Sequence, residues 1–313
     1  NNCVEKPRII NEEMEEDDSY SISDCCSDDN VIKYNERGRV KQITINHTKR
    51  MASHNGDWDD FDPHKSCNVE NFELPEEIKY LNDIEIFQLL SLPMIGGLPD
   101  GICNLRKLKV LGLVYDRLFY PKSYDVNLPL FFHQLNVLEE LVISGYNIKN
   151  SDILQISELK NLNRLSIYLN DHHKKELETL DLSPLSKLEI LETLDVDIPK
   201  YDFYSLKGIK NLKELTLDSN KVLINMDYLT KFIFNFPNLT DIYITGKFNG
   251  IVKSNFFKHP TLKYISIYNN SNDLQLDFTN EEFPECSYEG EFKRINVIGE
   301  IPESYQIFLN VMT

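Results

Sequence analysis

The chain has 313 residues, of which 41% are hydrophobic and 27% are charged, and this composition is typical of a folded protein. Its formal net charge of −17 at pH 7 repels the phosphate backbone of nucleic acids and disfavours a nucleic-acid partner. No apolar run approaches the roughly 20 residues of a membrane-spanning helix, so we expect no membrane span in this chain.

Residues 1–38 are acidic and contain cysteine, and we expect them to cap the N-terminal end of the fold. The chain opens Asn1-Asn2-Cys3, as expected of a processed mature chain or of an excerpt. The six cysteines gather toward the two ends, and none lies between residues 104 and 285, which indicates disulfide-pinned caps in an extracellular setting. The disulfide candidates are Cys3, Cys25, Cys26 and Cys67. Reduced cysteines in an intracellular protein remain the alternative, and no CxxC or HxxxH pair indicates a zinc site.

An insertion at about residues 51–70 follows the first predicted strand. Its aspartates Asp57, Asp59 and Asp62 have side chains that bind calcium in other proteins, but the Gly and distal Glu of a calcium loop are missing. We therefore expect a solvated insertion. His172 and His173 are likewise interpreted as part of an exposed loop, and no metal or other cofactor is predicted.

The main feature of the sequence is an LxxLxL pattern that recurs about every 21 to 30 residues over most of its length, which is the range of leucine-rich repeats. Its last two apolar positions alternate with polar ones, as in a short strand with one buried side. The pattern predicts an α/β fold, a leucine-rich-repeat solenoid of about ten repeats. A curved parallel β-sheet would form its concave face, with helices, 3₁₀ turns and loops on the convex face. The copies begin at Val40, Leu81, Leu108, Leu138, Leu162, Leu191, Leu212, Leu239, Leu262 and Phe292.

These copies define an array over residues 39–298, and residues 299–313 are expected to form a C-terminal cap. The sequons at Asn46, Asn238 and Asn269 are glycosylation candidates, although this composition produces about that many by chance.

Met94-Ile-Gly-Gly-Leu-Pro-Asp-Gly-Ile-Cys-Asn-Leu105 resembles the LxGxIPxxIxxL segment of plant-type extracellular leucine-rich repeats, as in plant receptor ectodomains and secreted fungal proteins. Val297–Ser304 matches the same segment, and Leu74–Leu81 is a partial copy. The stretch from Asp24 to Val40 resembles that family's N-terminal cap, although Lys33-Tyr34 stands where a further cysteine is expected. The resemblance implies that Cys3 pairs with Cys25 or Cys26. It also implies a secreted or cell-surface protein that binds a partner on its concave face and has no enzymatic activity.

The outward side chains of the predicted strands form the candidate binding face. Its middle is acidic and its C-terminal half is rich in tyrosine, a residue that is enriched in binding hot spots. A basic protein or peptide, or a glycan that stacks on tyrosine, would fit; ordinary solvated strand residues are the alternative. The candidate binding residues are Arg164, Tyr168, Asp195, Asp197, Glu214, Asp218, Asp241, Tyr243, Tyr264 and Tyr268.

Two function classes follow from this sequence. The first is a non-enzymatic extracellular recognition module for a protein or glycan, since no Walker loop, GxSxG elbow or HExxH helix is present. The second is a structural protein that packs its repeats against itself or a scaffold partner. Exposure of Phe119, Tyr120, Phe131 and Phe132 would favour the second class, and their burial within a long repeat would remove that argument. An intracellular scaffold is the third interpretation.

Overall fold

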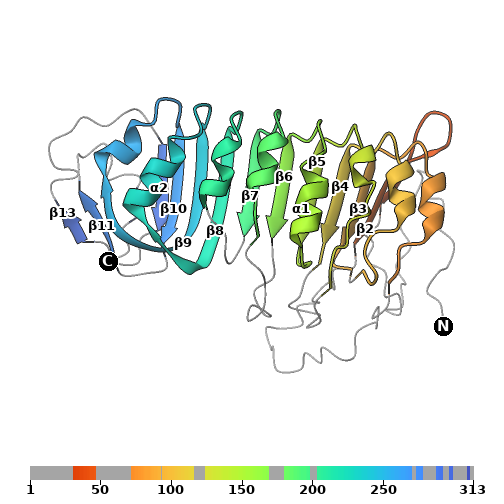
Figure 1. The fold of residues 1–313 in the computed structure, drawn as a ribbon, viewed down its shortest axis with the longest axis horizontal. Helices are drawn as coiled ribbons and strands as arrows, with labels where there is room; N and C mark the ends of the chain where they lie inside the picture. Colours follow the sequence, from red (N-terminus) through yellow and green to blue (C-terminus); the bar gives the residue numbers. More distant parts are fainter. Residues whose placement is uncertain are drawn as a thin grey trace, which may run out of the picture.

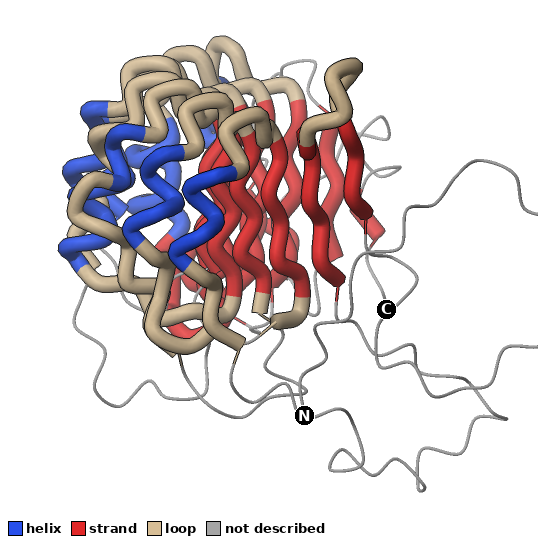
Figure 2. The backbone as a smooth tube through the Cα atoms, turned by 90° about the vertical axis from the view of Figure 1, so that its right-hand side faces the viewer, coloured by secondary structure: helices blue, strands red, loops and turns tan. Residues whose placement is uncertain are grey.

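The computed structural model describes residues 31–46, 72–92, 94–115, 124–168, 180–197, 203–269, 273–277, 287–291, 296–298 and 309–310. In these ranges the strands stack side by side along the long axis of the molecule, and short helical segments lie on one side of the resulting sheet (Figure 1). Figure 2 shows the two layers from the end, with the strands on one side and the helices on the other. The predicted leucine-rich-repeat solenoid is therefore confirmed.

The strands follow one another across the sheet in chain order. β1 and β2 are antiparallel, and every later neighbour up to β10 is parallel. Because each strand pairs with the next strand in the chain, each repeat contacts mainly its neighbours, as in other solenoids. The strands are β1 Val31–Tyr34, β2 Val40–Asn46, β3 Ile86–Leu90, β4 Val110–Val114, β5 Glu140–Ser144, β6 Arg164–Tyr168, β7 Thr193–Asp197, β8 Glu214–Asn225, β9 Asp241–Lys253 and β10 Tyr264–Asn269.

The other layer consists of short helices and 3₁₀ turns, one in most repeats. The α-helices are α1 Asn150–Ile156 and α2 Met226–Ile233, and Asn225 caps α2 by accepting hydrogen bonds from the backbone N–H groups of Asp227 and Tyr228. The 3₁₀ turns are Glu76–Tyr80, Asp100–Asn104, Phe132–Gln134, Ser183–Lys187, Phe203–Gly208 and Ser254–Lys258.

The core lies between the two layers. The inward residues of successive strands form buried rows, such as Leu111, Leu141, Leu165, Leu194 and Leu215, each 0% exposed. The turns add buried residues from the other side, such as Ile102, Phe132 and Leu185. Burial of one such leucine stabilises the fold by about 1.5–3 kcal/mol, so this continuous core holds the repeats together.

Gly145 shows how closely neighbouring repeats approach at the end of β5. Its φ is +81°, a conformation that L side chains rarely adopt, and a Cβ built on it would clash with the carbonyl oxygen of Tyr115. Its N–H donates a hydrogen bond of 2.8 Å to the carbonyl oxygen of Tyr168 in the next repeat. Glycine at this position therefore lets three consecutive repeats stack.

The register corrects one predicted copy of the pattern. The sequence predicts a copy at Leu81, Ile84 and Ile86, which makes Ile86 an inward residue. In the structure Phe87 and Leu89 pair with Leu111 and Leu113 and are buried, and Ile86 is outward and half-buried. Leu81, Ile84 and Ile86 satisfy LxxLxL, and so do Ile84, Phe87 and Leu89. Pairing of β3 with β2 and β4 selects the second set.

The C-terminal copy at Phe292 is also placed differently. The main sheet continues through β12 (Ser287–Glu291), which pairs with β10, and then through β14 (Leu309–Asn310). The predicted strand at 295–297 corresponds to β13 (Asn296–Ile298), which pairs with β11 (Asp273–Asp277) in a separate ladder.

This second ladder begins in the long strands β8 and β9, whose lower ends bend in Figure 1. Leu223–Asn225 of β8 pairs with residues 247–249 of β9, and residues 249–253 of β9 pair with β11. The C-terminal repeats thus carry strands as well as helices and 3₁₀ turns outside the main ladder. This lateral ladder was not predicted.

Candidate functional site: the open face of the sheet

The sheet has one face toward the helices and one face away from them, which we call the open face. Inward residues such as Leu165 and Ile167 are buried, and the alternating residues between them point to the open face. Strand register aligns the open-face residues of β3–β10 in three rows. The first row is Ile86, Val110, Glu140, Arg164, Thr193, Glu214, Asp241 and Tyr264; the second is Gln88, Gly112, Val142, Ser166, Asp195, Thr216, Tyr243 and Ser266; the third is Leu90, Val114, Ser144, Tyr168, Asp197, Asp218, Thr245 and Tyr268.

All ten residues that the sequence analysis selected for binding lie in these rows. The structure therefore brings them together on one face, from β6 to β10. Arg164, Glu214 and Tyr243 are exposed, and most of the others are half-buried by neighbouring strands. Tyr268 is placed by the backbone register of β10 alone.

The middle of the open face is strongly acidic. Ser166 donates a hydrogen bond of 2.8 Å from its hydroxyl to Oδ2 of Asp195 on the next strand. Burial raises the pKa of Tyr168 to about 12, and the negative charges of Asp195, Asp197 and Asp218 add to this rise. Strand register places these three aspartates on two neighbouring strands of the same face.

The C-terminal part of the face carries a tyrosine pair. The rings of Tyr243 on β9 and Tyr264 on β10 have centroids 5.0 Å apart and planes inclined by 40°. Tyr243 is 40% exposed, so part of its ring faces solvent. An aromatic pair of this kind presents a rigid apolar surface with polar edges.

The N-terminal part of the face is apolar, and the sequence analysis did not identify it. Ile86, Leu90, Val110, Val114 and Val142 point to the open face over β3–β5, and each is half-buried. We call these five residues the apolar patch. The signal was present in Val110-Leu-Gly-Leu-Val114, where apolar residues occupy both faces of the strand instead of alternating with polar ones.

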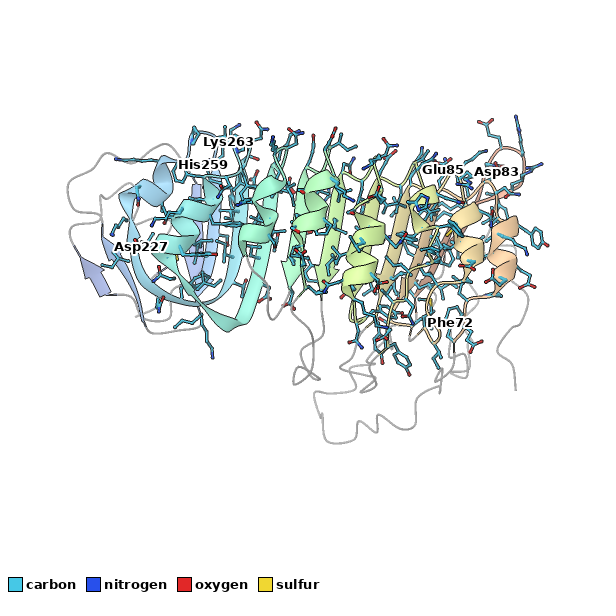
Figure 3. The ribbon with its side chains drawn as sticks, in the orientation of Figure 1. Phe72, Asp83, Glu85, Asp227, His259 and Lys263 are labelled. Atoms are coloured by element: carbon cyan, nitrogen blue, oxygen red, sulfur yellow. The ribbon has the colours of Figure 1, made fainter. Side chains whose placement is uncertain are left out.

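Charged residues at the upper edge of the first repeats pair with each other and lie outside the three rows (Figure 3). Asp83 contacts Arg39 at 3.0 Å and also Lys107, and these two cations hold the pKa of Asp83 below its ordinary value. Glu85 lies 3.5 Å from Lys41 and 3.3 Å from Lys109. These ion pairs link three repeats, and we assign them a structural role.

The remaining predicted sites are only partly within the described ranges. Cys3, Cys25, Cys26 and Cys67 lie outside them, as do the insertion aspartates, His172 and His173. In the ranges that the structure describes, no group of three or more His, Cys, Asp or Glu residues is arranged to hold a metal ion. No helix within those ranges has the length and apolar character needed to cross a membrane.

The glycosylation candidates differ in their surroundings. Asn238 is exposed, and its amide donates hydrogen bonds to the carbonyl oxygen of Lys210 at 3.2 Å and to Oδ1 of Asn211 at 3.4 Å. Asn46 ends β2 and is half-buried, and Asn269 is the last residue of β10.

The four aromatic residues that would indicate self-assembly also differ. Phe132 is fully buried and Phe131 is 52% exposed, whereas Phe119 and Tyr120 lie outside the described ranges. Leu130 and Leu154 are further exposed apolar residues in or beside the helical segments, at 69% and 51%. The helical side thus has exposed apolar residues of its own.

Among the solved structures that resemble this chain, one reaches a TM-score of 0.50 and supports the same fold. A leucine-rich-repeat protein of Leptospira interrogans is 18% identical with a TM-score of 0.50, and the match covers 76% of this chain and 63% of that one. Internalin C2 of Listeria monocytogenes is 21% identical with a TM-score of 0.43, over 65% of this chain and 77% of the internalin. The plant peptide hormone receptor RGFR1, solved in complex with RGF2, is 17% identical with a TM-score of 0.48, over 88% of this chain and 42% of the receptor.

No curated protein matches the sequence significantly. The model of the leucine-rich repeat region family, in contrast, matches residues 66–288, which are most of the array. Together with the repeating strands and turns, this match shows that the chain belongs to the leucine-rich repeat region family.

Proposed function

We propose that this chain is a non-enzymatic extracellular recognition module that binds a partner protein through the open face of its sheet. One observation carries the proposal: the open face presents an apolar patch, an acidic centre and a tyrosine pair in continuous rows across β3–β10. The other face of the same strands forms the core.

Parallel sheets in folded proteins are usually covered on both faces, because their strands carry apolar residues on both sides. Here the helices and 3₁₀ turns of the described ranges lie on one side only (Figure 2). Aliphatic and aromatic side chains on the opposite side are the kind of surface that protein partners cover. Tyr243 is the more exposed of the two paired tyrosines and is a candidate hot-spot residue.

The chemistry of the face favours a basic protein partner over a glycan. Asp195, Asp197 and Asp218 attract cationic groups, whereas a neutral glycan gains little from a carboxylate cluster beyond hydrogen bonds. A glycan would instead depend on Tyr243 and Tyr264, which stack only at the C-terminal end of the face. The extracellular setting is supported by the cysteine distribution and by the resemblance of the repeat segments to plant-type extracellular repeats.

A binding screen against extracellular proteins and a glycan array would test this proposal. The affinity of every binder would be measured again for the open-face variants Tyr243→Ala and Glu214→Arg. Leu154→Ala and Glu189→Arg, whose residues are exposed outside the open face, are the matched controls. We expect the open-face variants to lose at least about tenfold in affinity, or about 1.4 kcal/mol, and the controls to retain binding. Binding that is lost in the control variants and retained in the open-face variants would overturn the proposal. If only glycans bind in a way that the open-face variants weaken, the partner is a glycan instead of a protein.

The extracellular setting has a separate test, which is the intact mass of protein from its native source before and after deglycosylation and reduction. A mass shift would show occupied sequons or paired cysteines. An unmodified mass with six free thiols would contradict secretion without affecting the role of the open face.

Self-association is a second candidate function, and the exposed side chains of Leu130, Phe131 and Leu154 favour it. Its test is the oligomeric state by light scattering as a function of concentration. If copies associate through this side, Leu130→Ser and Leu154→Ser will shift the protein to monomer, and Tyr243→Ala on the open face will leave the oligomer intact.

A further inference from the structure

The open face is divided along the solenoid into two chemically different halves. The apolar patch covers β3–β5, and carboxylates dominate β7 and β8 through Asp195, Asp197, Glu214 and Asp218. Arg164 on β6 is the only lysine or arginine in the three open-face rows of β3–β10.

We infer that the partner is a protein whose contact surface places apolar side chains over β3–β5 and lysine or arginine side chains over β7–β8. This inference rests on the proposed function, since it specifies what the open face recognises.

The surroundings of the apolar patch support this assignment. On its N-terminal side, Gln42 donates to the hydroxyl of Thr44 at 3.3 Å, and that hydroxyl donates to Oε1 of Gln88 at 3.0 Å. The Gln88 side chain also lies over Gly112, since its Cγ is 3.1 Å from the position of a Cβ there. Gln88 is the middle open-face residue of β3, so polar groups border the patch at β2 and also separate Ile86 from Leu90, and charged residues follow on β6 to β8. Protein interfaces likewise combine apolar contacts with hydrogen-bonding groups.

The charge of the second half decides which partner fits. Strand register places Asp195, Asp197 and Asp218 on the open face of β7 and β8, and the whole chain carries a net charge of −17. An acidic partner, including the open face of a second copy of this chain, would be repelled here. A basic surface would be attracted, and complementary charge fixes the orientation of a partner as well as speeding its association.

The distance between the two halves fits one contiguous partner surface. Neighbouring strands lie about 4.8 Å apart, so the three strand spacings from β4 to β7 correspond to about 14 Å. An extended segment rises about 3.3 Å per residue, and about four to five residues would span this distance. A partner segment with an apolar cluster and, about four or five residues away, a basic cluster would contact both halves at once.

The first step of the test is selection from a displayed library of random peptides on the purified full chain. The inference predicts enrichment of peptides with both clusters at this spacing. Selected peptides are then measured by titration calorimetry against two variants of the open face. Val110→Thr with Val142→Thr makes the patch polar at nearly unchanged volume, and Asp195→Asn with Asp218→Asn removes two charges while keeping side-chain oxygens that can accept hydrogen bonds. Ile190→Thr and Glu189→Gln are matched controls at exposed positions outside the open face.

The two variants should weaken binding in different ways. The aspartate variant should lose at least about fivefold in affinity at low salt and less at high salt, because screening already weakens the same attraction in the parent. The valine variant should lose a similar amount of affinity at every salt concentration, because the interaction that it removes is apolar contact. Urea unfolding of each variant verifies that the fold is retained, and the controls should bind as the parent does.

The outcomes separate this inference from the proposed function. Peptides that lack basic residues, or binding unaffected by Asp195→Asn with Asp218→Asn, would overturn the two-part partner. If Tyr243→Ala still abolished that binding, the open face would remain the recognition surface. Peptides whose affinity is unchanged by every open-face variant would overturn both the two-part partner and the proposed function. A selection that enriches nothing, while a peptide receptor processed in parallel yields its binders, would overturn the two-part partner as well.

Discussion

The hydroxyl of Tyr146 donates a hydrogen bond of 2.7 Å to the carbonyl oxygen of Leu92, 54 residues earlier in the chain. The hydroxyl oxygen of Tyr146 in turn accepts a hydrogen bond of 3.3 Å from the N–H of Met94. Tyr146 is fully buried. One tyrosine thus reaches across neighbouring repeats and satisfies two backbone groups that would otherwise lie unpaired in the core.

We expect Tyr146→Phe to destabilise the fold by about 1–3 kcal/mol, because it leaves a buried carbonyl and a buried N–H without their partner. Urea unfolding followed by circular dichroism measures the loss. Tyr80→Phe is the matched control, since Tyr80 is 70% exposed, and it should leave the unfolding midpoint unchanged. Equal midpoints for Tyr146→Phe and the parent would mean that water or a backbone shift replaces the hydroxyl.

The repeating strands could be predicted because their period is a local property of the sequence. Alternation alone places Leu165 and Ile167 inward, and therefore places Ser166 and Tyr168 on the open face, as the structure confirms. The register of β3 could not be predicted in this way, since Ile84 with Ile86 and Phe87 with Leu89 both satisfy the pattern. Only hydrogen bonding to β2 and β4 selects between them.

Two other features depend on contacts between distant residues. The bend of β9 depends on pairing of its C-terminal half with β11, which no repeat motif marks. The hydrogen bonds of Tyr146 likewise depend on how closely the repeats stack. The apolar patch has a local sequence signal, because apolar residues occupy both alternating positions of Val110–Val114.

His259 should make the fold less stable in mild acid. Its side chain is buried, its ring lies 5.2 Å from the ring of Phe234, and burial lowers its pKa below the ordinary value, although carbonyl groups of Phe236 and Ile233 oppose this (Figure 3). A histidine with a lowered folded-state pKa binds fewer protons in the folded chain than in the unfolded chain. Its destabilising effect is therefore absent above the unfolded pKa of about 6.5 and grows as the pH falls through that value toward the folded pKa.

The measurement is the free energy of unfolding in urea at about pH 7.5 and pH 5.5 for the parent and for His259→Leu. The parent should lose more stability between the two pH values than the variant does, because the variant lacks the proton uptake at this position. The other histidines contribute equally to the loss of stability in the parent and in the variant, so their contribution cancels when one loss is subtracted from the other. Identical losses would show that the ring is accessible to water and titrates normally.

Cys103 should resist alkylation in the folded chain. Its side chain is buried, and burial, assisted by the negative charge of Asp100, raises the pKa of its thiol to about 11. Because the thiolate is the reactive form, modification by iodoacetamide near neutral pH should be slow until the chain unfolds. Peptide mass spectrometry at Cys103 across a urea series gives the extent of modification, which should rise together with the unfolding transition. Rapid modification without urea would contradict the burial of this thiol.

The electrostatics of the open face can be tested without any partner, through the ionisation of Tyr168. Its pKa is raised to about 12, first by burial and then by Asp195, Asp197 and Asp218. In Asp195→Asn with Asp218→Asn the charge contribution falls and the burial contribution stays, so the pKa should decrease but remain above the ordinary value of about 10. NMR of tyrosine labelled at Cζ follows the titration, and Tyr168→Phe identifies the signal. Glu189→Gln removes one carboxylate outside the open face and should leave this pKa unchanged. An unchanged pKa in the double aspartate variant would show that burial alone shifts Tyr168, and the acidic centre would then lack the concentrated charge that a basic partner requires.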